Sequence, residues 1–167
     1  MIDRTANLLG AVAQLVSDRQ AQAIDQAVGL NGSSAAALIT IGNAPEQRID
    51  FLYKVLGLSQ SATTRMVAKL ETQGLIKRAQ TQDGRTVSLV LSAKGKRTVK
   101  TILEARDKAL FNCLGYLTAA EQGEIDGLLA KLLAASVIDE HQAFQMCRFC
   151  NGDDCDPCPV EEVFEQE

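Results

Sequence analysis

Apolar residues recur every three or four positions along most of the chain, which is the spacing of an amphipathic α-helix. The pattern covers residues 5–28, about 35–42, 49–56, 60–73, 93–114 and 119–133. Over 75–81 and 86–91 short apolar runs replace it, and Val87, Leu89 and Leu91 stand at every second position, as is typical of β-strands. The sequence therefore predicts four helices, a two-stranded hairpin with its tip at 82–85, and two further helices.

The predicted helices begin and end at suitable residues. Side chains that can accept a hydrogen bond from a helix-start amide precede four of them, at Ser33 or Ser34, Ser59, Ser92 and Thr118. Glu121 follows Thr118 by three positions and completes a capping box. Glycines that can end a helix stand at Gly29, Gly57 and Gly74.

The third and fourth predicted helices are short and are joined by a tight turn at Gly57. Two short helices in this order, followed by a hairpin, are typical of a helix-turn-helix with a two-stranded wing. The predicted fold class is therefore mainly α with a small β-hairpin wing, a winged helix-turn-helix.

The composition agrees with a folded helical protein. Hydrophobic residues make up 46% of the 167 residues, aromatic residues only 4%, and there is no Trp. No apolar run reaches the roughly 20 residues that span a bilayer, and the first residues lack the pattern of a signal peptide. We therefore expect a cytoplasmic protein with no membrane partner.

The charge is unevenly distributed. The net charge is −4, but residues 47–100 hold eleven Lys or Arg against three Asp or Glu, a local charge of +8 that leaves −12 for the rest. A polyanion such as DNA responds to the local field of the basic third. A solvated charged face is the alternative explanation of the same pattern.

Four motifs resemble the MarR (multiple-antibiotic-resistance regulator) family. They are LSQSATTRMVAKLETQGLI at 58–76, Asp-Gly-Arg at 83–85, Leu-Ser-Ala-Lys-Gly at 91–95 and Leu-Thr-Ala-Ala-Glu at 117–121. The resemblance implies a DNA-binding winged helix. It also implies a homodimer formed by the N- and C-terminal helices, with two reading helices set on a pseudo-palindromic double-stranded DNA operator.

A DNA-binding set follows from the motif and from the chemistry of a helix in the major groove. Small polar residues allow close approach, Arg65 can reach a guanine edge or a phosphate, and Lys69 lies one turn further on. By resemblance, Arg85 contacts the minor groove and Asp83 holds the wing. The predicted set is Gln60, Ser61, Ala62, Thr64, Arg65, Lys69, Arg78, Asp83 and Arg85. The alternative is that the hydroxyl residues only cap the helix and that Arg85 only pairs with Asp83.

The chain continues into an acidic, cysteine-rich tail, residues 141–167. Its spacing is C-x2-C-x4-C-x2-C, formed by Cys147, Cys150, Cys155 and Cys158. Two such pairs suit zinc, an iron–sulfur cluster is an alternative cofactor, and redox thiols or no cofactor are the others. Cys113 lies outside this group, on an apolar helix face, where we expect it to pack.

The predicted organisation is a dimerisation helix at 1–30, a winged helix-turn-helix at 31–92, dimerisation helices at 93–140 and the tail at 141–167. The predicted function is a sequence-specific transcriptional regulator, a repressor released by a small-molecule, metal or redox signal. The alternative is a small redox or metal-binding protein that uses the cysteine pairs. No nucleophile–base pair, phosphate loop or paired carboxylates stand out, so we expect no enzyme. The effector and operator stay open.

Overall fold

The structure of the protein is a computed structural model that describes residues 3–44, 47–80 and 87–165. Its elements are α1 (Arg4–Val28), α2 (Gly32–Asn43), α3 (Ile49–Leu56), α4 (Gln60–Thr72), β1 (Ile76–Gln80), β2 (Val87–Leu91), α5 (Ala93–Leu114), α6 (Ala119–Ser136), α7 (Glu140–Met146), a short 3-10 turn (Gly152–Asp154) and α8 (Glu162–Glu165). The predicted order of helices and hairpin is confirmed.

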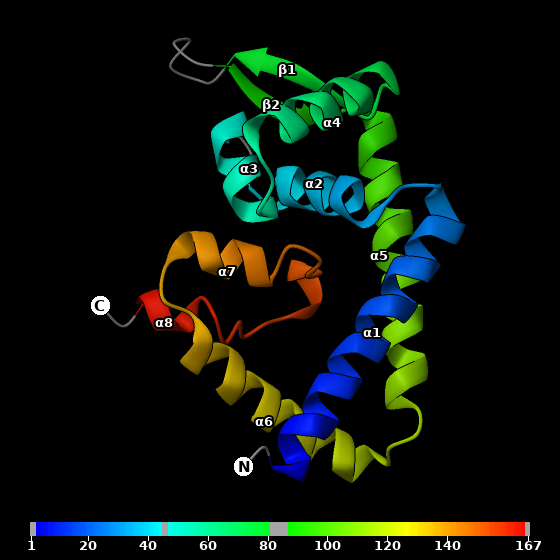
Figure 1. Cartoon of the computed structure of the whole chain (residues 1–167), viewed down its shortest axis with the longest axis vertical. Coiled ribbons are helices and arrows are strands. Elements are labelled where there is room, and N and C mark those ends of the chain that lie inside the picture. Colours follow the sequence, from blue (N-terminus) through cyan, green and yellow to red (C-terminus); the bar gives the residue numbers. More distant parts are fainter. Residues whose placement is uncertain (1–2, 45–46, 81–86, 166–167) are drawn as a thin grey trace.

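The molecule is elongated, with three parts that Figure 1 shows clearly. We call α2, α3, α4, β1 and β2 the head. We call α1, α5 and α6 the body, because α1 and α5 lie side by side below the head and α6 turns back across their far end. The tail lies between head and body, with α7 next to α3.

Three of the four predicted helix starts are confirmed, and one prediction was wrong. Ser59 and Ser92 accept from the amides of Ala62 and Gly95 at 3.2 and 2.9 Å, and Thr118 forms the capping box. The cap of α2 is neither Ser33 nor Ser34. Asn31 fills this position, and its side chain accepts from the Ser34 amide at 2.9 Å.

This difference moves the start of α2 forward to Gly32, and it places Ser34 inside the helix, where it is buried. An Asn that precedes a helix in an extended conformation reaches the third amide as well as a serine does. Asn31 lies first along the chain, so the two serines become helical residues.

The hairpin is antiparallel, and its register runs from Ile76 opposite Leu91 to Gln80 opposite Val87. β1 begins at Ile76, one residue after the start of the predicted range 75–81, and β2 ends at Leu91, the last residue of the predicted range 86–91. The predicted hairpin tip lies outside the described residues. Leu75 is buried just before β1, where its carbonyl accepts from the Ser92 amide at 2.9 Å.

The core sits in the head and continues into the top of the body. Leu38, Leu52, Val67, Leu70 and Leu89 are at most 3% exposed and come from α2, α3, α4 and β2. The same cluster includes Ile24 of α1 and Ile102 of α5, both fully buried. Leu75 is buried in this core as well, whereas Leu58, before the start of α4, is only half-buried.

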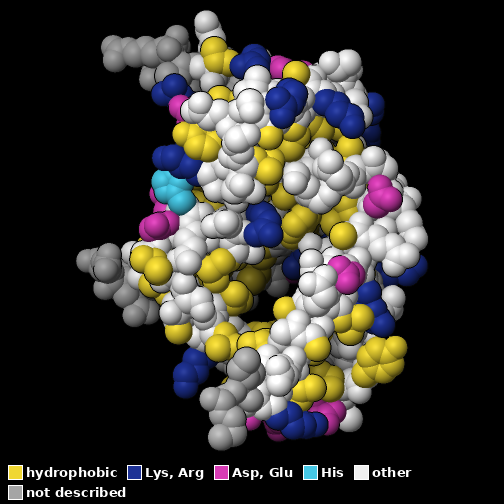
Figure 2. All heavy atoms as spheres, in the orientation of Figure 1, with side chains coloured by type: hydrophobic (Ala, Val, Ile, Leu, Met, Phe, Trp, Pro, Cys, Tyr) yellow, Lys and Arg dark blue, Asp and Glu magenta, His cyan; other side chains and the backbone are white. Residues whose placement is uncertain are grey.

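The lower body exposes apolar side chains. They are Leu8, Leu9, Val12 and Leu15 of α1 and Leu128, Leu129, Leu132 and Leu133 of α6, each 37–63% exposed. Figure 2 shows apolar side chains on this part of the surface. In the described ranges no helix is both long and apolar enough to cross a membrane.

Candidate nucleic-acid interface

The turn between α3 and α4 is rigidly built. Gly57 adopts the left-handed conformation, at φ 64°, that ends α3, and the amide of Leu58 donates to the Tyr53 carbonyl at 3.1 Å. Ser59 then caps α4, as predicted. These bonds fix α4 relative to α3, so the direction of the outer face of α4 is set by the fold of the head.

The two faces of α4 differ as the sequence predicted, with one exception. Thr63, Val67 and Leu70 are buried against the head. The outward residues Gln60, Ser61, Thr64, Arg65 and Lys69 are exposed. Ala62 is half-buried, so it lies at the edge of the outward face rather than in its middle.

The hydroxyl groups on α4 already have local partners. Thr64 Oγ1 donates to the Gln60 carbonyl at 2.8 Å, and the hydroxyls of Ser59 and Ser61 lie 3.2 Å apart. In this arrangement the Thr64 hydroxyl can still accept a hydrogen bond, and its methyl group can contact another apolar group. A base amino group or a thymine methyl would therefore suit Thr64.

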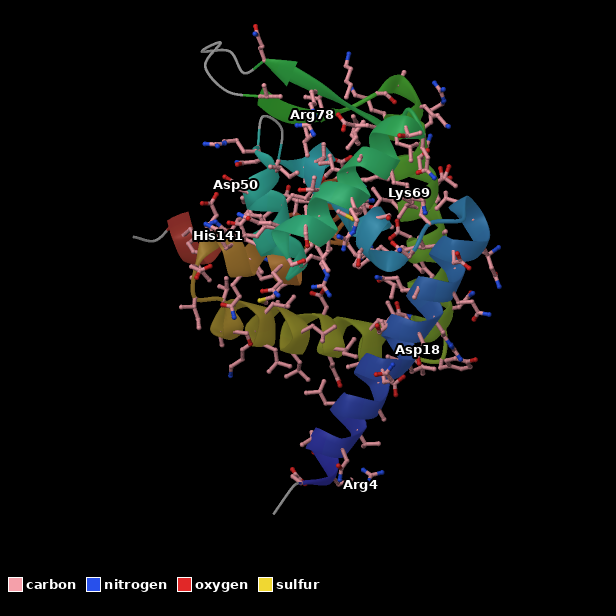
Figure 3. The ribbon with its side chains drawn as sticks, turned by 45° about the horizontal axis from the view of Figure 1, so that its top comes forward. Arg4, Asp18, Asp50, Lys69, Arg78 and His141 are labelled. Carbon is pink, nitrogen blue, oxygen red and sulfur yellow. The ribbon has the colours of Figure 1, made fainter. Side chains whose placement is uncertain are left out.

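Two cations on α4 are available to an anionic partner. Within the described ranges, neither Arg65 nor Lys69 forms a salt bridge, and both are exposed. Figure 3 shows Lys69 on α4 and Arg78 on β1, both in the head and far from Arg4 at the other end of the molecule. The predicted wing residues Asp83 and Arg85 lie outside the described residues, so their roles stay predictions.

Arg78 is held by an acidic neighbour. Its Nε lies 3.0 Å from Glu71 Oε1 and its second nitrogen 3.5 Å from Oε2. The pair is exposed and contributes at most about 1 kcal/mol, but it ties β1 to α4. A phosphate contact by Arg78, as predicted, would have to share or displace this carboxylate.

The joint between α4, the wing and α5 contains contacts that the sequence did not reveal. Ser92 Oγ donates to the Gly74 carbonyl at 2.6 Å, and Lys94 Nζ donates to the Gln73 carbonyl at 2.8 Å. A cation at the C-terminal end of α4 is favoured by the helix dipole. The only sequence signal was the Ser-Ala-Lys-Gly motif. That motif predicted a helix start, but it did not predict these two hydrogen bonds to the end of α4.

The four tail cysteines lie together. Each is a half-buried free thiol. Cys147 lies near Cys150, Cys150 near Cys155, and Cys155 near Cys158, close enough for each thiol to influence the pKa of its neighbour. As they stand, no group of three or more His, Cys, Asp or Glu in the described parts of the chain is set out as ligands of a metal ion. The thiols therefore converge without forming a finished metal site.

These contacts shift the pKa values of the thiols in different directions. The hydrogen bond from Cys150 lowers the pKa of Cys147 below its ordinary value, whereas the same bond together with burial raises the pKa of Cys150. Burial and the neighbouring thiols raise the pKa of Cys155 to about 11. Cys113 stands apart on α5, half-buried, where it accepts from Arg19 at 3.5 Å.

The comparison with protein families matches the head. Residues 30–87 match the model of the MarR family. This segment is therefore similar to a MarR-family domain. It includes α2, α3, α4 and β1, so the outward face of α4 described above belongs to the matched MarR segment.

Curated relatives match part of the chain. The chain is 34% identical over 82 residues to an uncharacterized HTH-type transcriptional regulator, YwhA, of Bacillus subtilis, which covers 48% of this chain and 59% of that protein. It is 29% identical over 112 residues to the transcriptional repressor MprA of Escherichia coli, covering 65% and 64%. The chain thus matches about three fifths of the length of these relatives.

Solved MarR structures share the fold. A MarR family protein from Bacillus stearothermophilus has a TM-score of 0.70 at 25% identity, covering 79% of this chain and 95% of that one. Rv1404 from Mycobacterium tuberculosis has a TM-score of 0.68 at 23% identity, covering 82% and 96%. The MarR family protein Rv2887 from the same organism, solved in complex with DNA, has a TM-score of 0.66 at 21% identity, covering 78% and 98%. These likenesses confirm the predicted winged helix-turn-helix.

Proposed function

We propose that this protein is a DNA-binding transcriptional regulator that reads its operator with α4. The observation that carries the proposal is the outward face of α4. This face is polar, carries two cations that form no salt bridge within the described part of the chain, and lies in the segment that matches the MarR family. The relatives named as transcriptional regulators and the DNA complex of Rv2887 support it.

The outward face suits the major groove. Ser61 and Thr64 are short enough to let the helix approach the base edges, and Arg65 carries the fork of donors that matches guanine. Lys69 lies one turn later, where a helix in the groove meets the phosphate backbone. In this arrangement Arg65 and Thr64 select sequence, whereas Lys69 contributes affinity that depends on salt.

We further propose that the protein acts as a homodimer formed by the body. The exposed leucines of α1 and α6 make a larger apolar surface than a monomer of this size needs to leave in water. Covering that surface with a second copy would place two heads on one DNA. Two-fold symmetry then requires an operator that is an inverted repeat.

A repressor role follows the name of the relative MprA, a transcriptional repressor. One structure of Rv2887 contains salicylic acid, which supports a small-molecule signal here. The thiol cluster of the tail supports a metal or redox signal instead. It also carries the second candidate function, a small metal-binding or redox protein. We propose no enzymatic role.

Selection from random double-stranded DNA tests the proposal. We expect the full-length protein to enrich an inverted repeat, and a variant of the outward face, Arg65→Ala, to enrich a different or weaker one. The matched control is Lys131→Ala, which removes an exposed cation from α6 and should leave the selected sequence unchanged. Recovery of unrelated sequences by the wild type would contradict the proposal.

The dimer has its own test. Leu132→Glu places a charge in the exposed apolar surface of α6 and should convert a dimer into monomers in sedimentation. Lys131→Glu changes the neighbouring residue to the same acid and should leave the dimer intact. A wild-type protein that sediments as a monomer at micromolar concentration would contradict this part of the proposal.

A further inference from the structure

The tail is packed against both head and body. Phe144 of α7 meets Phe51 of α3 edge-on, with ring centroids 5.0 Å apart, and the His141 ring lies tilted at 46° to the same ring, with centroids 5.8 Å apart. Phe149 packs against the core, and the side-chain amide of Asn43, at the end of α2, donates to the Cys150 carbonyl at 3.4 Å. The segment that carries the cysteines is therefore held in place by its neighbours.

The four tail cysteines line two neighbouring hollows. One hollow, of about 520 Å³, is bounded by Asn43, Phe144 and the acidic residues of the tail loop. The other, of about 400 Å³, faces α1, α5 and α6, and Figure 2 shows a hollow near the middle of the molecule, where these parts face one another. Because Cys147, Cys150, Cys155 and Cys158 line both hollows, they converge on one place.

Two arginines place positive charge beside the four cysteines, in the hollow that faces the body. Arg106 of α5 and Arg148 both line the hollow that faces the body. The Arg106 Nε is buried and has no hydrogen-bond partner among the residues that the structure describes, while another of its nitrogens donates to Asp107 at 2.6 Å. Asp153, Asp154 and Asp156 are exposed to solvent instead. A buried unpaired N–H beside four thiols is a donor suited to a thiolate.

We propose that Cys147, Cys150, Cys155 and Cys158 bind one Zn²⁺ ion as a tetrathiolate. Two pairs of cysteines with two intervening residues each match the all-thiolate donor set of structural zinc sites. The turn that brings the first pair together is in place, since the Cys150 amide donates to the Cys147 carbonyl at 2.7 Å. The proposed site requires the thiol side chains to rotate, because the described residues are not yet set out as ligands of one ion.

Binding replaces four thiol protons with the metal ion. Zn²⁺ and four S–H groups give a complex of charge −2 and release four protons, so no oxidant or reductant is needed. Arg106 and Arg148 offset the charge of the complex, and the buried Arg106 Nε donates to one of its sulfurs. The bound ion then holds the cysteine segment in one conformation and stabilises the packing of α7 on α3. In this way it strengthens the connection between the head and the body.

The test measures metal directly and does not involve DNA. Full-length protein purified without oxygen is loaded with Zn²⁺, desalted, and analysed for metal and for thiols that react with a chromogenic disulfide. We expect one zinc per protomer and one reactive thiol, Cys113. Cys150→Ser should lose the zinc. The matched control Cys113→Ser removes the cysteine outside the cluster and should keep it.

Two further measurements keep the proposal testable if Cys150→Ser folds poorly. Wild-type protein loaded with Co²⁺ should show the visible absorption of tetrahedral cobalt thiolate. Arg106→Met keeps all four ligands and should weaken zinc binding by about tenfold. Far less than one zinc per protomer, five reactive thiols, or disulfides in place of metal would each overturn the site. Because none of these results depends on an operator, they are independent of whether α4 reads DNA.

Discussion

Gly95→Ala is the substitution whose effect the structure defines most closely. Gly95 is buried in the first turn of α5, directly behind the wing. A Cβ atom at this position would lie 2.0 Å from the Leu75 carbonyl oxygen and 3.4 Å from Leu91 Cδ2. An ordinary contact is about 3.5 Å, so the backbone at Leu75 and the start of α5 would have to separate by roughly 1.5 Å.

The free-energy cost of this separation can be estimated from three contributions. Overpacking against backbone costs about 1–3 kcal/mol, and the bond from the Ser92 amide to the same carbonyl contributes about 1 kcal/mol. The helix preference for Ala over Gly offsets up to about 1 kcal/mol. We expect a net loss of about 2 kcal/mol, which corresponds to a melting temperature lower by about 4–8 °C.

Thermal unfolding at a fixed protomer concentration measures this change. The matched control is Gly123→Ala on α6, where an added Cβ meets nothing within 4 Å, so a gain of up to about 1 kcal/mol is expected. The contacts between the end of α4, the wing and the start of α5 also determine the position of the wing. Gly95→Ala should therefore weaken operator binding, whereas Gly123→Ala should not. Equal or higher stability of Gly95→Ala, with the control behaving as expected, would refute the reasoning.

Two further predictions concern the wing and the capping box. Arg85→Ala should weaken operator binding by about 1–3 kcal/mol without changing the dimer, and unchanged affinity in a titration would remove Arg85 from the interface. The Thr118 amide and hydroxyl donate to Glu121 and lower its pKa from 4.5, so its contribution to stability is complete above about pH 4.5 and is lost as the pH falls through the lower value. Glu121→Gln should therefore lose less stability on acidification than the wild type, and equal losses would contradict this.

Local chemistry made most of the fold predictable. The third predicted helix, Ile49–Leu56, is confirmed at both ends because an apolar run stops at a glycine that takes a left-handed conformation. The start of α2 was predicted wrongly because Asn31 and the serines Ser33 and Ser34 can all cap a helix. Which one does so depends on which residues the core buries, and α2 is buried from Ser34 onward.

Contacts between distant segments account for the rest. The position of the tail depends on the meeting of Phe51 and Phe144, which are 93 positions apart and carry no shared motif. The pairing of Arg78 with Glu71 likewise requires knowing how β1 crosses α4. Predicting the outward face of α4 required only the helical period and the motif. Its exposed residues were therefore predicted correctly, except for Ala62, which is half-buried.

Sequence preference at the operator tests most directly the claim that α4 reads DNA. Binding is measured over a library of operator variants and a range of salt for wild type, Arg65→Ala and Lys69→Ala. We predict that Arg65→Ala changes the preferred bases, whereas Lys69→Ala keeps them, weakens all sequences alike and lowers the salt slope by about one per site. Identical base preferences in the wild type and Arg65→Ala, with an unchanged salt slope in Lys69→Ala, would contradict the account.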